Sequence, residues 1–314
     1  MIQVSDLTKD YGPRRAIDKL SFSVNKGDVV GFLGPNGAGK STTMKIITGF
    51  MAPSHGTASV AGFDVFENPI EVKKRIGYLP ETPPVYADMY VREYLRYVAA
   101  LKQVPKDKIE KYVDHAIEKT NLGEVQKRLI HHLSKGFKQR VGIAQAIVSD
   151  PEVLILDEPT VGLDPKQVAE IRDLIKALKG QHTIILSTHI LPEVEATCEK
   201  VIIINKGRIV AEDSIHSLAT MEKGHQRLHV RLRKDVSDLK SVLAGVSAVT
   251  SVTLGASQKE WSIDLAGGED VVESISSLIV TQGFGLLELT PAKRDLEDVF
   301  LKLTYGQESK GGAV

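Results

Sequence analysis

Cysteine is almost missing from this sequence of 314 residues, because Cys198 is the only one. A single cysteine can form neither a disulfide within the chain nor a cysteine-based zinc site. Net charge is missing too, since 40 basic side chains balance 40 acidic ones. This balance argues against the strongly basic surface with which many proteins hold nucleic acid, so we expect no nucleic-acid partner.

Long apolar runs are also absent. The longest, such as Val153–Leu156 and Val201–Ile204, are far shorter than the roughly 20 residues that span a bilayer as a helix. The first residues, Met1–Asp6, lack the apolar core behind a basic start that marks a secretory signal. We therefore expect a cytoplasmic chain with no membrane span of its own, which works at a membrane only through a partner.

What remains is an ordinary globular composition, with 42% hydrophobic and 25% charged residues. At roughly 150 residues per domain, the length predicts about two domains. Short apolar runs without alternation predict a mostly parallel sheet covered on both faces, and hence an α/β fold. The predicted strands are Val29–Leu33, Val153–Leu156, Thr183–Ser187 and Val201–Ile204.

Helical patterns dominate residues 84–150. Val91–Leu101 and Lys108–Thr120 have helical spacing with charged residues on one face, which predicts a helical subdomain inserted into the α/β core. The short polar stretch Ser217–Gly224 marks a boundary, so we predict a first domain at residues 1–220.

The pattern changes in the remaining residues. Strand and helix signals follow one another as β-α-β-β-α-β, which is the ferredoxin-like order and predicts a smaller α+β domain at residues 221–308. The strand signals are Leu228–Arg233, Val249–Leu254, Glu260–Leu265 and Leu286–Leu289, and the helix signals are Val236–Ala244 and Val271–Thr281. A last helix is predicted at about residues 294–303, and residues 309–314 as a flexible tail.

A glycine-rich motif follows the first of the buried strands. The segment Gly34-Pro35-Asn36-Gly37-Ala38-Gly39-Lys40-Ser41 fits G-x-x-x-x-G-K-S between a strand and a helix that continues with Thr42. Glycines let backbone N–H groups converge on a phosphate, and the helix start adds its positive end. Lys40 supplies a cation for the β- and γ-phosphates, and the Ser41 hydroxyl can bind Mg²⁺. The motif therefore predicts a phosphate-loop NTPase.

Two carboxylates end a second buried strand. Asp157 and Glu158 follow Val153–Leu156 directly. In phosphate-loop enzymes an aspartate at this place holds the Mg²⁺ shell. The next residue, Glu158, could accept a proton from the water that attacks the γ-phosphate. We predict that Asp157 binds the metal and that Glu158 is catalytic.

With these motifs, residues 1 to about 220 resemble the nucleotide-binding domain of ATP-binding-cassette (ABC) transporters. The resemblance implies an ATP site completed by further residues, each at its usual place in the family's order. They are Tyr11 for adenine stacking, Glu81 in the loop near Mg²⁺, Ser134 and Gly136 of the signature Leu133–Arg140, Asp164 of Gly162–Pro165, and the catalytic sensor His189.

The sequence departs from the family pattern in two places. Lys135 and Phe137 replace the first glycine and the glutamine of the signature, while Glu81 replaces a glutamine. Ser134 can still cap a helix over Lys135–Ile147, so an anion site remains. These variants resemble those of ABC-2-type export systems, including gliding-motility and multidrug ATPases.

This resemblance implies a mechanism and partners. ATP is bound between two copies of the chain, with the phosphate loop of one facing Ser134 and Gly136 of the other. Hydrolysis opens this homodimer, and the motion passes to integral membrane permease subunits that carry out transport, with export favoured. The chain is then peripheral on the cytoplasmic face of the membrane.

Three other functions are alternatives to this one. A soluble ABC ATPase of the translation or DNA-repair type needs no membrane partner, but such proteins usually carry two cassettes or a long coiled coil. A GTPase needs Asn-Lys-x-Asp, whereas Asn205-Lys206-Gly207-Arg208 lacks the aspartate. A non-catalytic regulator could use the second domain as a ligand sensor.

Three single residues can also be explained by packing alone. Tyr11 could be a core aromatic instead of a nucleotide contact, with Phe22 as its nearby competitor for that packing role. Trp261 alternates with Ile263, which predicts a core position. Cys198 is expected to pack a helix.

Overall fold

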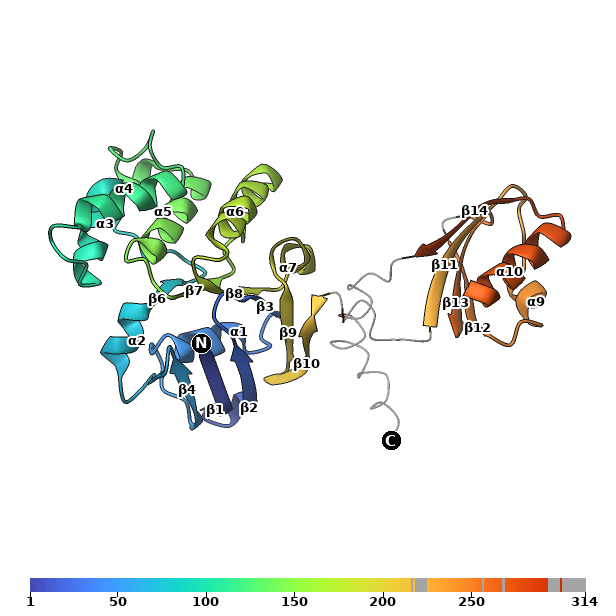
Figure 1. The fold of residues 1–314 in the computed structure, drawn as a ribbon, viewed down its shortest axis with the longest axis horizontal. Coiled ribbons are helices and arrows are strands. Elements are labelled where there is room, and N and C mark those ends of the chain that lie inside the picture. Colours follow the sequence, from blue (N-terminus) through green and yellow to red (C-terminus); the bar gives the residue numbers. More distant parts are fainter. Residues whose placement is uncertain (216, 218–224, 256, 267–268, 293–299, 301–314) are drawn as a thin grey trace. The chain divides into compact units, whose positions relative to one another are not determined.

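The computed structural model describes the chain except residues 216, 218–224, 256, 267–268, 293–299 and 301–314 (Figure 1). The described residues divide into two compact units, one over Met1–Ile215 and one within His216–Lys302. The division thus falls shortly before the boundary that we predicted at residue 220. Of the last predicted helix only Phe300 is described, and the predicted tail lies outside the described residues.

The first unit contains a six-stranded sheet in the order β10-β9-β3-β8-β7-β6 (Figure 1). Every neighbouring pair is parallel except β9 and β10, which confirms the predicted mostly parallel sheet. The strands are β3 (Val29–Leu33), β6 (Ile76–Leu79), β7 (Val153–Asp157), β8 (Thr183–Thr188), β9 (Lys200–Asn205) and β10 (Arg208–Ser214). Because β3, β8 and β7 are neighbours, the segments that follow them meet at one edge of the sheet.

A second, antiparallel sheet was not predicted from the sequence. Its order is β2-β1-β4-β5. The strands are β1 (Ile2–Tyr11), β2 (Arg14–Val24), β4 (His55–Val60) and β5 (Phe63–Asp64). Leu7 and Leu20 of this sheet share one apolar core with Phe32 of β3 and Met44 of α1. This shared core fixes the antiparallel sheet beside the phosphate loop.

Seven α-helices are described in the first unit. They are α1 (Lys40–Ile47), α2 (Pro69–Arg75), α3 (Val91–Leu101), α4 (Ile109–Lys119), α5 (Lys135–Ile147), α6 (Pro165–Leu178) and α7 (Leu191–Thr197), with a short 3₁₀ turn at Ile130–His132. Helix α3 has the predicted bounds, and α3, α4 and α5 pack on one another (Figure 1). Ion pairs from Arg92 and Arg96 of α3 to Glu110 of α4 join two of these helices. Among the described residues, no helix has the length and apolar character needed to cross a bilayer.

The second unit is a four-stranded antiparallel sheet in the order β12-β13-β11-β14, which is the predicted ferredoxin-like arrangement. Its elements are β11 (His225–Leu232), α9 (Leu239–Leu243), β12 (Val249–Leu254), β13 (Glu260–Ala266), α10 (Glu269–Thr281) and β14 (Leu286–Ala292). Trp261 is buried in its core, as predicted. Helix α9 is shorter than predicted, because the Asp238 carboxylate caps it by accepting a hydrogen bond from Ser241 N at 3.1 Å.

Candidate active site

The phosphate loop links β3 to α1, and its glycines are required by the backbone. Gly37 and Gly39 have φ angles of +79° and +109°, which residues with a side chain rarely adopt. At Gly34 a Cβ atom would lie 2.3 Å from the carbonyl oxygen of Ile204. The loop can therefore curl closely only with glycine at these positions, and helix α1 begins immediately after it at Lys40.

Lys40 folds back over the loop from which it emerges. Its side chain is only 5% exposed, and Nζ donates hydrogen bonds to the carbonyl oxygens of Gly34 at 2.8 Å and Pro35 at 3.3 Å. Nζ also lies 3.3 Å from Oε1 of Glu158. A buried ammonium is thus held by oxygen atoms at the point where phosphate charge would enter.

Asp157 is the buried carboxylate at the end of β7. It is 1% exposed and accepts a hydrogen bond from Ser187 Oγ at 2.7 Å. Burial raises the pKa of Asp157, and hydrogen bonds from Ser187 and Ser41 oppose that rise. A carboxylate and a hydroxyl in contact are suitable oxygen ligands for Mg²⁺, whose charge would compensate the buried anion.

Glu158 connects the phosphate loop with the end of β8. Its Oε2 atom lies 2.9 Å from Nδ1 of His189, while its other oxygen faces Lys40. Glu158 has a φ angle of +51°, an uncommon conformation that is held partly by a hydrogen bond from Glu158 N to Ser187 O at 2.8 Å. The structure therefore brings together a cation, a carboxylate and an imidazole from three segments far apart in sequence.

A cavity of about 730 Å³ opens over these groups. It is lined by Tyr11, Arg14, Ala16, Asn36, Gly37, Gly39, Lys40, Ser41, Thr42, Glu81, Glu158, Val161 and His189. Arg14, Ala16 and Val161 were missed in the sequence analysis, since none belongs to a motif. Ala16 is placed by the close approach of its carbonyl oxygen to Gly39, where a Cβ atom would lie at 2.8 Å.

Tyr11 lies at the rim of this cavity and is not a core aromatic. It is 45% exposed, and its hydroxyl group donates to Sδ of Met51 at 2.9 Å. Phe22 fills the core position instead and packs against Phe32 with ring centroids 5.6 Å apart. The plainer interpretation of Tyr11 is therefore wrong, and its ring is accessible for stacking.

Among the predicted residues that do not line the cavity, three lie at the starts of α5 and α6. Ser134 caps α5 as predicted, with its Oγ accepting from Phe137 N at 3.4 Å. Asp164 caps α6, and its Oδ1 accepts from Gln167 N at 2.9 Å. Gly136 packs against the Gln167 side chain, which a Cβ atom would approach to 2.8 Å. The predicted site residues thus form two groups, one around the phosphate loop and one at these two helix starts.

The sequence matches known proteins over nearly its whole length. It is 34% identical to the bacitracin transport ATP-binding protein of Bacillus licheniformis, covering 98% of both chains. It is 31% identical to the Nod factor export ATP-binding protein I of Ralstonia nicotianae, covering 99% of this chain and 95% of that one. The family model described as ABC transporter matches residues 17–161. The chain belongs to the ABC transporter family. It is an ATP-binding subunit that hydrolyses ATP to drive a transporter, as predicted.

Solved structures agree with this assignment. An ATP-binding subunit of an ABC transporter is 32% identical, covers 70% of this chain and 92% of its own, and superposes with a TM-score of 0.65. A dimeric ATP-binding cassette in a post-hydrolysis state with ADP and Pi, at 22% identity and a TM-score of 0.63, has the same fold. The predicted phosphate-loop core of the ABC type is therefore confirmed.

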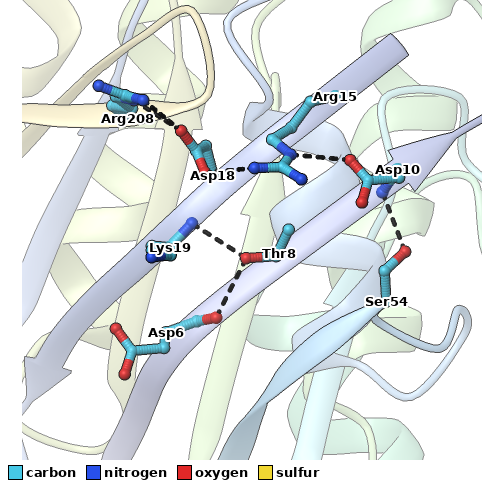
Figure 2. A network of polar contacts seen from close by, with 8 residues as sticks. All are labelled: Asp6, Thr8, Asp10, Arg15, Asp18, Lys19, Ser54 and Arg208. Carbon is cyan, nitrogen blue, oxygen red and sulfur yellow. Dashed lines mark hydrogen bonds and ion pairs between the residues drawn. The ribbon is translucent and has the colours of Figure 1, made fainter. Parts of the chain in front are cut away.

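One flank of this ABC ATPase carries a polar network that joins β1, β2 and β10 (Figure 2). Asp18 accepts hydrogen bonds from Arg208 at 2.7 Å and Arg15 at 3.1 Å. Arg15 also donates to Asp10 at 2.9 Å, one residue before Tyr11. These two arginines lower the pKa of Asp18. The network links the strand end that carries Tyr11 to the rest of the ATPase.

The turn between β9 and β10 is attached to the phosphate loop. Gly207 N donates to Ala38 O at 2.9 Å, and Asp18 N donates to Gly207 O at 2.9 Å. The string Asn205–Arg208, which lacks the aspartate of a guanine-binding motif, is therefore a structural turn against the loop.

Proposed function

We propose that this ATPase powers export through separate integral membrane permease subunits, with Mg-ATP bound between two copies of the chain. Relatives named for bacitracin transport and Nod factor export support a transport role, and the second name supports export as its direction. The chain would then be cytoplasmic and held at the membrane face by the permease subunits. The helical segment after Glu81 would pass the opening and closing motion of the dimer to the permease subunits.

The proposal of a homodimer rests on the separation between the two groups of site residues. The cavity around Lys40 does not include Ser134, Gly136 or Asp164 among its lining residues. A second copy can supply these groups to the γ-phosphate without unfolding either helix start. ATP would hold the two copies together, because its charge joins two sets of hydrogen-bond donors.

The phosphate loop, residues 34–42, is proposed to bind the triphosphate and Tyr11 to stack on adenine. Ser41 would bind Mg²⁺ directly, Asp157 would hold its ligand shell, and Glu81, which lines the same cavity, would contribute an oxygen. When bound, Mg²⁺ would neutralise charge on the phosphate oxygens. These roles fit the buried Asp157 carboxylate in contact with the Ser41 hydroxyl.

Glu158 is proposed as the general base for the attacking water. Its carboxylate faces the cavity, and His189 lies against it at 2.9 Å. His189 would orient this carboxylate and sense the γ-phosphate, while Lys40 would balance its charge. A nearby carboxylate that accepts a proton typically contributes about 10²–10⁴-fold to the rate.

The decisive experiment uses the full chain with Glu158→Gln, which keeps the shape of the side chain and removes its basicity. With saturating Mg-ATP we expect a dimer by light scattering, and a monomer with Mg-ADP. A chain that stays monomeric with Mg-ATP, alone and together with its membrane subunits, would refute the shared site. Co-purification of the wild-type chain with a multi-span protein from detergent-solubilised membranes tests the transport partner.

A further inference from the structure

We propose that Glu193 is a positioning residue for ATP hydrolysis, which holds Glu158 and His189 in their working geometry. The inference rests on the roles proposed above for those two residues. Glu193 lies in the first turn of α7 and is only 2% exposed. A carboxylate removed from water in this way is costly unless hydrogen bonds compensate it. Its partners therefore indicate what this buried group stabilises.

Both partners are hydroxyl groups next to the proposed catalytic residues. One oxygen of Glu193 accepts a hydrogen bond from Thr160 Oγ1, and the other accepts from Thr188 Oγ1 at 2.9 Å. Thr160 follows Glu158 by two positions, and Thr188 directly precedes His189. Both threonines are buried. A single carboxylate thus joins the segment after β7 to the end of β8.

The same contacts reach the backbone of the site. Thr188 Oγ1 accepts from Ile190 N at 3.1 Å, and Thr188 O accepts from Gly34 N at 3.3 Å, which connects this unit to the phosphate loop. Glu158 keeps its uncommon φ angle of +51° only if the residues around it are held firmly. Ser187 holds Glu158 on one side through the backbone, and Glu193 holds it on the other through Thr160.

Glu193 acts through these neighbours and does not itself face the nucleotide. Both of its oxygens accept hydrogen bonds, and the residue is not among those that line the cavity. The properties of Glu193 that matter are therefore the shape of its side chain and its capacity to form two hydrogen bonds. Glutamine can keep one of these hydrogen bonds through its carbonyl oxygen and replace the other by a bond in the reverse direction, from its amide NH₂ to a threonine hydroxyl oxygen, whereas alanine can form neither.

The test measures kcat and the KM for ATP of the full chain with Glu193→Ala or Glu193→Gln, while Glu195→Gln on the exposed side of the same helix is the control. We expect Glu193→Ala to lower kcat at least about tenfold, because small displacements of reacting groups are costly. ATP affinity should change less than about threefold, since the phosphate loop is intact. Glu193→Gln should stay within about threefold of the wild-type kcat.

A wild-type kcat for Glu193→Ala would overturn the proposal. So would a Glu193→Gln variant as slow as the alanine variant, because the charge would then matter more than the geometry. If Glu193→Ala does not fold, Thr160→Val and Thr188→Val take its place, and normal rates in both would overturn the proposal. Glu158→Gln measured in parallel separates the two claims: a normal rate there refutes the catalytic role of Glu158, whereas a slow rate with a normal Glu193→Ala refutes only the inference.

Discussion

The ammonium group of Lys40 and the carboxylate of Glu158 lie 3.3 Å apart, although Glu158 follows Lys40 by 118 positions in the sequence. Both side chains are buried, so each partly neutralises the other in a poorly solvated site. A triphosphate entering the cavity would compete with Glu158 for Lys40. Nucleotide binding would thereby free an oxygen of the proposed base for the attacking water.

Lys40→Ala should weaken ATP binding, because the phosphates lose a charged hydrogen-bond donor. A loss of about 1.5–3 kcal/mol corresponds to roughly 10- to 150-fold weaker binding. Titration with a fluorescent ATP analogue measures the change. Lys45→Ala, on the same helix but outside the cavity, is the control, and equal affinities for the two variants would contradict the assigned contact.

Glu158→Gln should slow hydrolysis by about 10²–10⁴-fold while ATP still binds. The amide keeps the size of the side chain but cannot accept the proton from water. Single-turnover phosphate release measures the chemical step separately from product release. Glu152→Gln, an exposed position just before β7, should hydrolyse at the wild-type rate. Normal turnover by Glu158→Gln would exclude Glu158 as the base.

Tyr11→Ala should weaken ATP binding while Tyr11→Phe should not, because stacking needs the ring and not the hydroxyl group. Stacking of a base on an aromatic side chain is worth about 1–3 kcal/mol, or roughly 5- to 150-fold in affinity. Inorganic tripolyphosphate, which has no base, should compete equally well in both variants. An alanine variant that binds ATP normally would remove Tyr11 from the adenine site.

Ser134→Ala should abolish dimer-dependent hydrolysis, yet leave binding of ATP to the phosphate loop intact. The signature serine is proposed to act on the nucleotide of the other copy. Mixing this variant with Lys40→Ala chains should therefore restore activity, because a heterodimer has one complete site. The two variants measured separately are the controls. A mixture that is no more active than either variant alone would argue against action across the dimer. Loss of the cap would also cost α5 about 0.5–2 kcal/mol, so melting must be checked.

Asp18→Asn should destabilise the ATPase at neutral pH, with an effect that depends on pH. Arg208 and Arg15 lower the pKa of the folded-state carboxyl group from its ordinary 3.8, so its contribution to stability is present above that value and is lost as the pH falls through the folded pKa. The difference in the free energy of unfolding between wild type and variant should be constant well above the ordinary pKa of 3.8 and shrink as the pH falls through the lowered pKa of the folded state. Urea melts across this range measure it, and a difference that does not vary with pH would point to packing instead of charge.

Much of the ATPase core followed from local sequence. Strand Val29–Leu33 and helix Val91–Leu101 were predicted with their observed bounds, because unbroken apolar runs and helical spacing are signals within a few residues. The antiparallel sheet of β1, β2, β4 and β5 was not predicted. The pairing of β1 with β4 joins segments that are far apart in the sequence, and the pairings of β1 with β2 and with β4 contain register shifts that obscure simple alternation. Helix α9 is shorter than its helical spacing predicts, because Asp238 caps it at its start.

The proposed site, too, has one part that follows from local sequence and another that depends on the tertiary structure. The order of the glycines, Lys40 and Ser41 determines a phosphate loop wherever a strand precedes it and a helix follows, since the backbone geometry is local. The pairing of Glu158 with His189, and the bridge that Glu193 forms behind them, arise only because β7 and β8 are neighbours in the sheet. Strand order is decided by packing of the whole domain, and no spacing along the chain encodes it.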